Sequence, residues 1–372
     1  LLLMIPNMYK IAGELLPSVF HVSARCVASH ALNIFGDHSD VYACRQTGFA
    51  MLAETNTQEV MDLGAVAHLA TIESRVPFLN FFDGFRTSHE IQKIETWDYA
   101  DLKEMCNMDA VKAFRDHALN PNNPAMRGSH ENGDVFFQHR EACNSVYDAL
   151  PEVVRKYMAK INVKLGTNYD LFNYYGADDA DRVIVAMGSF CDVAEEVVDY
   201  LNANGEKVGL IKVRLYRPWV SEAFLKVLPK TCKKLAVLDR TKEPGSLGEP
   251  LFLDVATTLR EANLCDVKLC GGRYGLGSKD TPPSSVFAVF TELAKDEPSV
   301  IISRRPCALL KEVKHEKPLI VSQDKCKSCK MCMKIGCPAI SMKGGKAKID
   351  ETLCVGCGVC TQMCKFDAIN KA

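Results

Sequence analysis

Several familiar signatures are missing from this chain of 372 residues. No apolar run approaches the ~20 residues that a transmembrane helix needs, so we expect no association with a membrane. No G-x-G-x-x-G motif follows an expected strand, and Walker-type, HExxH and GxSxG motifs are also absent. The net charge of −1 gives no electrostatic indication of a partner.

The beginning of the chain gives no sign of a targeting sequence. Residues 1–5 are apolar, but Pro6 ends the stretch and no basic flank precedes it, which is unlike a signal peptide. Because the chain starts with leucine in the middle of a pattern, we expect it to be a fragment of something longer.

Cysteine, in contrast, is abundant, with 17 residues. Two C-x2-C-x2-C blocks near the C-terminus each have a fourth cysteine: Cys326, Cys329, Cys332 and Cys337, and then Cys354, Cys357, Cys360 and Cys364. Three thiolates on a tight loop can hold three corners of a cubane, and in two-cluster ferredoxins the fourth cysteine of each block ligates the other cluster. We therefore expect two [4Fe-4S] clusters and electron transfer, one cluster on Cys326, Cys329, Cys332 and Cys364, the other on Cys354, Cys357, Cys360 and Cys337.

A pair of structural zinc sites and a disulfide framework are the other interpretations of these cysteines. Zinc usually takes two ligands from each C-x2-C pair, which leaves the third cysteine of each block unused. Further scattered cysteines in a long chain do not fit a small secreted domain, and reduced thiols predict a cytoplasmic or anaerobic compartment. Two features depart from the ferredoxin pattern: four residues rather than three precede Cys337, and Lys365 stands where proline is usual.

The charges of residues 322–372 agree with the cluster interpretation. Nine lysines, no arginine and four carboxylates give this segment a formal charge of +5. The lysine excess partly offsets the negative charge of eight thiolates around two clusters. Because Phe366 is the only aromatic residue there, stacking partners are missing and no nucleic-acid partner is expected.

Outside this tail, the pattern predicts alternating strands and helices. The expected buried strands are 41–44, 78–82, 183–187, 208–213 and 235–238, and the expected helices are 48–69, 141–160 and 191–203. Strands separated by helices predict a mostly parallel sheet with helices on both faces, and a second, doubly wound α/β unit is expected to begin near Arg182. In such a unit, ligands or partners favour the C-terminal ends of the strands.

Three further features carry weak functional signals. The glycine-rich stretch 271–277 has the wrong spacing for a phosphate cradle, and a flexible turn explains it better. Asp83, Arg86 and His89 form a polar group beside a strand end, for which interface or loop anchoring is the favoured explanation. Residues 295–321 are charged and are expected to form a solvated connector.

Five long stretches resemble a known family: PNMYKIAGELLPSVFHVSAR (6–25), FFDGFRTSHEIQKIE (81–95), LFNYYGADDADRVIVAMGS (171–189), LDRTKEPGSLGEPL (238–251) and GGRYGLGSKD (271–280). They are similar to the pyruvate:ferredoxin (flavodoxin) oxidoreductases, which are thiamine-diphosphate enzymes. The resemblance implies an α/β fold with a pyrimidine-binding-type thiamine domain, truncated at its N-terminus, over 1–165. A smaller doubly wound, transketolase-C-terminal-like domain (166–298), a linker (299–321) and a small α+β ferredoxin-like domain with two [4Fe-4S] clusters (322–372) are expected to follow.

The tail resembles a different relative. VIISRRPCALLKEVKHEKPLIV (300–321) and the closing FDAINKA are similar to the C-terminus of the indolepyruvate ferredoxin oxidoreductase large subunit. In that enzyme a thiamine-diphosphate domain precedes the segment, but no G-D-G…N-type magnesium–diphosphate motif stands before it here. A natural fusion, an internal deletion and an assembly artefact would each give such a chain.

The resemblance implies part of a 2-oxoacid:ferredoxin oxidoreductase, with pyruvate as the favoured 2-oxoacid. Such enzymes decarboxylate the 2-oxoacid oxidatively to acyl-CoA and CO2 and pass electrons through the clusters to ferredoxin or flavodoxin. The family's arginine that binds the substrate carboxylate corresponds to Arg25, and a guanidinium suits bidentate recognition of a carboxylate.

Thiamine diphosphate and Mg²⁺ are implied for the intact enzyme, but the resemblance places its catalytic glutamate and a substrate-binding threonine upstream of Leu1. The chain alone is therefore expected to be inactive in decarboxylation and to need a second copy or a complementary subunit.

Three alternatives remain. In the first, the chain is a non-catalytic iron–sulfur electron-transfer module whose α/β domains dock a partner. In the second, the α/β part is a binding scaffold with a structural zinc tail. The third is a subunit of an indolepyruvate ferredoxin oxidoreductase. Visible absorption separates zinc from cubanes, and thiamine-diphosphate binding separates the oxidoreductase from the electron-transfer module.

Overall fold

The computed structural model describes residues 1–122, 124, 127–295, 317–335 and 337–371. The chain divides into two compact units, Leu1–Ser303 and Arg304–Ala372. Most of the expected connector, residues 299–316, lies outside the described residues. Within the described ranges, no helix is both long and apolar enough to cross a membrane.

The first unit contains two sheets, and the first of them is mixed. Its strand order is β1-β3-β2-β7, in which β1, β2 and β3 are parallel and β7 is antiparallel to β2. The strands are β1 (Val19–Ala24), β2 (Ala50–Ala53), β3 (Phe78–Asp83) and β7 (Leu215–Arg217). Every residue of β2 is buried, because it is a central strand with neighbours on both sides.

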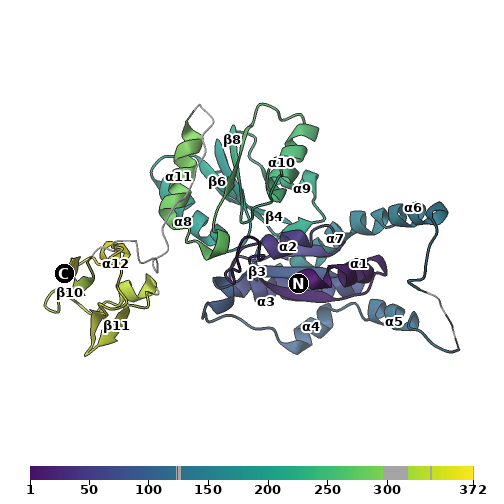
Figure 1. Ribbon diagram of the computed structural model, residues 1–372, viewed down its shortest axis with the longest axis horizontal. Helices are drawn as coiled ribbons and strands as arrows, with labels where there is room; N and C mark the ends of the chain where they lie inside the picture. The colour runs from purple at the N-terminus through teal and green to yellow at the C-terminus, as the bar shows by residue number, and fades with distance from the viewer. Residues whose placement is uncertain (123, 125–126, 296–316, 336, 372) are drawn as a thin grey trace. The chain divides into compact units, whose positions relative to one another are not determined.

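Helices pack against this sheet and extend from it. The long helix α3 (Thr57–Ser74) begins at Asn56, whose side chain accepts a hydrogen bond from the backbone N–H of Glu59. It packs on α7 (Asn144–Leu165). The other helices of this part are η1 (Leu2–Met4), α1 (Ile5–Gly13), α2 (Ser39–Ala43), η2 (Thr87–His89), α4 (Tyr99–Met105), α5 (Met108–Asp116) and α6 (Gly133–Ala142). Both α5 and α6 lie on an arm that extends away from the sheets (Figure 1).

The second sheet is doubly wound. Its order is β4-β6-β5-β8-β9, with four parallel strands and β4 antiparallel at one edge, so the strand order reverses between β5 and β8. The strands are β4 (Phe172–Gly176), β5 (Arg182–Ala186), β6 (Val208–Val213), β8 (Lys234–Asp239) and β9 (Lys268–Arg273). Helices α8 (Phe190–Ala203) and α11 (Pro283–Ala294) lie on one face, and α9 (Ser221–Val227) and α10 (Pro250–Glu261) lie on the other (Figure 1). The prediction of a mixed α/β fold with parallel sheets is confirmed.

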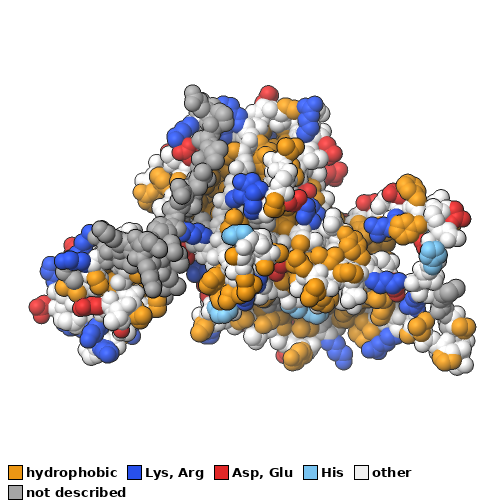
Figure 2. Space-filling model, in the orientation of Figure 1, with side chains coloured by type: hydrophobic (Ala, Val, Ile, Leu, Met, Phe, Trp, Pro, Cys, Tyr) orange, Lys and Arg blue, Asp and Glu red, His pale blue; other side chains and the backbone are white. Residues whose placement is uncertain are grey.

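The two sheets share a hydrophobic core. It joins Met51 and Phe78 of the first sheet with Val185 and Leu235 of the second. A smaller core lies between α8, α11 and the doubly wound sheet. Not every apolar side chain reaches these cores. Figure 2 shows apolar side chains on the face that carries the N-terminal helices, and Leu3 there is 97% exposed.

The second unit is small and contains two antiparallel strand pairs. Strand β10 (Leu319–Val321) pairs with β13 (Ile369–Lys371), and β11 (Ile340–Lys343) pairs with β12 (Lys346–Ile349). The short helices η4 (Met331–Ile335) and α12 (Val359–Met363) contact each other and carry cysteines of the two blocks. Its core joins aliphatic side chains with the buried Cys332 and Cys360. The unit therefore has the expected α+β character.

Two of the secondary-structure predictions are wrong. The prediction of a strand at 41–44 fails because these residues form α2 and its C-terminal end. The prediction of one helix over 48–69 fails at its beginning, where Ala50–Ala53 is strand β2 and the helix starts only at Thr57. The strands predicted at 78–82, 183–187, 208–213 and 235–238 and the helices at 141–160 and 191–203 correspond to β3, β5, β6, β8, α7 and α8 within a few residues.

Candidate functional site

Arg25 lies directly after β1, at the C-terminal edge of the first sheet. Its Nη1 donates a hydrogen bond to the carbonyl oxygen of Ile34 at 3.0 Å, and its Cζ lies 4.3 Å from the centroid of the Phe85 ring. The Nε atom is buried without a hydrogen-bond partner among the described residues. A Cβ at Gly84 would lie 2.6 Å from this Nε and 2.4 Å from the carbonyl oxygen of Ala24, so the turn requires glycine. The guanidinium is thus held in place by its contacts with Ile34 and Phe85.

Asp83, the last residue of β3, places a buried carboxylate where the two sheets meet. Its Oδ1 lies 2.5 Å from Nε2 of His38, and its Oδ2 lies 2.8 Å from Nη1 of Arg240. The same Oδ2 accepts a hydrogen bond from the backbone N–H of Ser189 at 2.8 Å. Burial alone would raise the pKa of the Asp83 carboxyl, but His38 and Arg240 hold that pKa well below its usual value.

These contacts occupy the C-terminal ends of the doubly wound sheet. Ser189 follows β5 and Arg240 follows β8, so both lie where the strand order reverses, the usual ligand position in such sheets. Asp83 from the first sheet fills this position instead. Beside it, Asp239 accepts hydrogen bonds from the Tyr42 hydroxyl at 2.8 Å and from two backbone N–H groups at the start of α10. Burial raises the pKa of Asp239 to about 6. The strand ends therefore form an internal interface.

The polar group predicted from Asp83, Arg86 and His89 is divided in the structure. Asp83 is fully buried, as described above. The side chain of Arg86 is 63% exposed and its Nη2 lies 4.0 Å from Oε1 of Glu90. The His89 ring stacks on the Phe85 ring, with 4.9 Å between centroids. These contacts fit the anchoring explanation, because each residue holds the loop after β3 in a different way.

The expected flexible turn at 271–277 is only partly correct, because residues 271–273 end strand β9 and residues 276–277 begin η3 (Leu276–Ser278), so that Tyr274 and Gly275 alone connect the two elements. Gly275 and Gly277 have φ values of 60° and 59°, which glycine adopts without strain. The Nε of Arg240 donates a hydrogen bond to the carbonyl oxygen of Gly275 at 3.1 Å, and the N–H of Gly277 donates to Oδ2 of Asp37 at 3.4 Å. A carboxylate already faces this backbone, so the structure gives no support for a phosphate cradle here.

In the second unit, Cys364 of the second block is near the cysteines of the first block. Burial raises the pKa of the Cys332 thiol, and the neighbouring thiols of Cys326, Cys329 and Cys364 raise it further. Backbone N–H groups lower the pKa of the Cys326 thiol. Four thiols on two separate segments have the donor chemistry that a cubane takes. Within the described residues, however, the cysteines do not converge into a group of three that could hold a metal ion.

The reciprocal arrangement surrounds Cys360. Burial raises the pKa of its thiol to about 11, and the thiols of Cys357, Cys354 and Cys337 add to this shift. Cys337 comes from the first block. The last cysteine of each block is therefore near the cysteines of the other block. This exchange is the one that the ferredoxin pattern predicts.

The residues fit thiamine diphosphate only in part. Arg25 places a guanidinium at the C-terminal edge of the first sheet. For the accompanying Mg²⁺, the described residues of the first unit contain no group of three His, Cys, Asp or Glu side chains that could hold a metal ion. No binding position for the diphosphate group can therefore be assigned among the described residues.

Three families match successive parts of the chain. Residues 1–159 match "Pyruvate flavodoxin/ferredoxin oxidoreductase, thiamine diP-bdg", and residues 180–286 match "Pyruvate:ferredoxin oxidoreductase core domain II". Residues 347–370 match "4Fe-4S binding domain", which includes the second cysteine block. The predicted cofactors, iron–sulfur clusters and thiamine diphosphate, agree with these matches.

Individual relatives agree with the families. The pyruvate-flavodoxin oxidoreductase of Enterobacter agglomerans is 60% identical over 298 residues, and the pyruvate:ferredoxin oxidoreductase of Moorella thermoacetica is 61% identical over 298 residues. Each match covers 80% of this chain and 25% of the relative, so the chain spans about a quarter of the length of these relatives.

A solved 2-oxoglutarate:ferredoxin oxidoreductase from Magnetococcus marinus matches at 16% identity with a TM-score of 0.49, over 78% of this chain and 52% of that one. A likeness at this level carries no argument about function. The chain is thus similar to two domains of the pyruvate:ferredoxin oxidoreductases within residues 1–286 and to a 4Fe-4S binding domain after them.

Proposed function

We propose that the chain is part of a 2-oxoacid:ferredoxin oxidoreductase, with pyruvate as its substrate. The proposal rests on one observation: a segment of 298 residues about 60% identical to pyruvate oxidoreductases is joined to a unit with two groups of four cysteines. Bound thiamine diphosphate would supply the decarboxylation chemistry, and iron–sulfur clusters would carry the electrons. Coenzyme A and ferredoxin or flavodoxin are the proposed further partners, and a homodimer or a complementary subunit completes the enzyme.

The cluster ligands are part of this proposal. One [4Fe-4S] cluster is assigned to Cys326, Cys329, Cys332 and Cys364, and the other to Cys354, Cys357, Cys360 and Cys337. The neighbouring thiols raise the pKa of Cys332 and of Cys360, which supports the assignment. The proposed domains are the thiamine type at 1–165, the doubly wound type at 166–298, a linker at 299–321 and the cluster domain at 322–372. The end of the expected linker needs correction, because Leu319–Val321 forms β10, which pairs with β13 of the cluster domain.

Arg25 is the residue proposed to receive the substrate carboxylate. Its contact with Phe85 and its hydrogen bond to Ile34 fix the guanidinium, so little rotamer entropy remains to be lost on binding. Its position at the C-terminal edge of the parallel strands β1, β3 and β2 supports this role. Its chemistry would be to bind and orient the 2-oxoacid, not to transfer a proton, because guanidinium stays charged.

Replacing Arg25 by alanine should weaken pyruvate binding about tenfold or more, because a hydrogen bond to a charged group contributes about 1.5–3 kcal/mol. Calorimetric titration with pyruvate in the presence of thiamine diphosphate measures the loss. Pyruvamide, which lacks the carboxylate, should bind equally to both proteins.

Arg86→Ala is the matched control, since it removes an exposed guanidinium from the same loop region. Equal pyruvate affinity of the wild-type protein and the Arg25→Ala variant would remove Arg25 from the proposed site.

The purified chain alone should show no pyruvate-dependent reduction of ferredoxin, because it spans about a quarter of the relatives' length and the described residues assign no diphosphate position. Anaerobic assays with pyruvate, coenzyme A, thiamine diphosphate and Mg²⁺ measure this rate, and dithionite-reduced chain serves as the positive control for electron transfer. Turnover above the rate without pyruvate would show that the chain holds a complete site.

A second candidate function is a non-catalytic electron-transfer module. The lack of a G-D-G…N-type magnesium–diphosphate motif before residue 300 favours it for the chain in isolation. Thiamine-diphosphate binding by the purified chain would argue against this candidate. For residues 300–372 we also propose descent from an indolepyruvate ferredoxin oxidoreductase large subunit, which the quoted similarity of the tail supports.

A further inference from the structure

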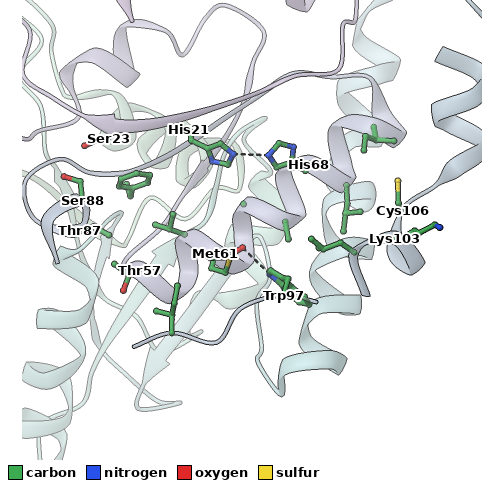
Figure 3. A pocket seen from close by; sticks show the side chains of 18 of the residues that line it. His21, Ser23, Thr57, Met61, His68, Thr87, Ser88, Trp97, Lys103 and Cys106 are labelled. Carbon is green, nitrogen blue, oxygen red and sulfur yellow. Dashed lines mark hydrogen bonds between the residues drawn. The ribbon is translucent and has the colours of Figure 1, made fainter. Parts of the chain in front are cut away.

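Two histidines meet at the wall of a cavity in the first unit. His21 belongs to β1 and His68 to α3, and their Nε2 atoms lie 3.0 Å apart. The two rings point toward each other, with 5.2 Å between their centroids (Figure 3). Because a strand and a long helix hold the two residues, their separation is set by the fold and not by a loop.

We propose that His21 and His68 form a binding site for a divalent transition-metal ion such as Zn²⁺. Imidazole nitrogens bind Zn²⁺ at about 2.0–2.1 Å, so two ligands at angles between 90° and tetrahedral lie roughly 2.9–3.4 Å apart. The observed 3.0 Å lies within this range. In the metal-free protein the same two atoms share one proton in a hydrogen bond, and the ion replaces that proton.

Asn80 is placed to hold His21 in the form that binds a metal. It lies opposite His21 in the pairing of β1 with β3, it is fully buried, and its amide Nδ2 lies 3.2 Å from Nδ1 of His21. Its Oδ1 has no hydrogen-bond partner among the described residues. With the amide turned over, this oxygen accepts the proton of Nδ1 and leaves the lone pair of Nε2 for the ion. A metal-bound histidine almost always donates its other N–H in this way.

The cavity gives the ion access and room for water. It has a volume of about 870 Å³, and both histidines line it together with Ser23 and apolar side chains such as Met61 and Trp97 (Figure 3). Both imidazoles are exposed to solvent. No third His, Cys, Asp or Glu completes a metal site within the described part of the chain, so water must fill the remaining positions. The ion would therefore have two protein ligands, and its other coordination positions would stay open to water.

Zinc binding to the cluster-loaded protein tests the proposal, because loaded clusters occupy the thiols that would otherwise compete. Calorimetric titration with Zn²⁺ should show one site that is lost in His21→Gln and in His68→Gln. The loss should exceed the roughly 10–100-fold weakening caused by removing an outer-shell partner. His89→Gln is the matched control, because it removes a histidine whose ring stacks on the Phe85 ring.

A second readout uses the wild-type protein alone. X-ray absorption at the zinc edge should show imidazole and oxygen ligands without sulfur. Modification by diethyl pyrocarbonate, followed by peptide mass spectrometry, should be slowed by Zn²⁺ at His21 and His68 and unchanged at His89. Sulfur ligands, or equal modification of His21 and His68 with and without Zn²⁺, would overturn the proposal. It is independent of the proposed oxidoreductase function.

Discussion

Changing Cys364 to serine should halve the iron bound per chain, from about eight to about four atoms, and should remove the cluster held by the first cysteine block. Cys364 belongs to the second block in sequence, but its thiol, like those of Cys326 and Cys329, raises the pKa of the Cys332 thiol in the first block. Iron and acid-labile sulfide analysis measures the loss, and electron paramagnetic resonance of the reduced protein identifies the cluster that remains.

The identity of the lost cluster decides between crossed and uncrossed ligation. The remaining signal of Cys364→Ser should match that of Cys326→Ser and differ from that of Cys354→Ser. Cys265→Ser serves as the control, because this exposed cysteine lies in the first unit and should keep both clusters. A Cys364→Ser spectrum identical to that of Cys354→Ser would contradict the crossed assignment.

Replacing Asp83 by asparagine should lower the free energy of unfolding of the α/β unit by about 3–5 kcal/mol, because breaking a buried ion pair leaves the Arg240 guanidinium without its countercharge. Urea unfolding followed by circular dichroism at neutral pH measures the change. The pKa of Asp83 is lowered by folding, so its contribution is complete above the unfolded value near 3.8 and is lost as the pH falls toward the folded value. The variant should lack this part of the acid dependence.

Asp116→Asn is the matched control for this effect. It removes a carboxylate that pairs with Lys112 at 2.7 Å on the exposed surface of α5. Exposed ion pairs contribute little to stability, so the free energy of unfolding of Asp116→Asn should be nearly unchanged. A loss below about 1 kcal/mol in Asp83→Asn would mean that the buried network does not hold the two sheets together.

Local patterns in the sequence predict the strands of the doubly wound sheet well. Residues 183–187 and 208–213 are short apolar runs between turn residues, and both are buried strands. The same rule fails at 41–44, because a run of four apolar residues cannot distinguish a strand from one turn of buried helix. It fails again at Ala50–Ala53, where residues with good helix propensity form a fully buried central strand. There, pairing with β3 and β7 outweighs local preference.

Some of the candidate sites can likewise be predicted from the sequence, and others cannot. The cysteine spacing carries enough information to propose eight ligands, because most of them lie within a few residues of one another. The network around Asp83 could not be predicted, since its contacts with His38 and Ser189 span 45 and 106 residues. The same holds for His21 and His68, which are 47 residues apart and have no motif around them. Only the packing of α3 against β1 brings them together.

We propose that the C-terminal unit holds two [4Fe-4S] clusters that carry electrons for a 2-oxoacid oxidoreductase. Anaerobic purification, iron and acid-labile sulfide analysis, and electron paramagnetic resonance before and after dithionite test this proposal. We expect about eight irons and eight sulfides per chain, with two interacting reduced-cubane signals. Zinc in place of iron, or no bound metal in the anaerobically purified protein, would contradict the account.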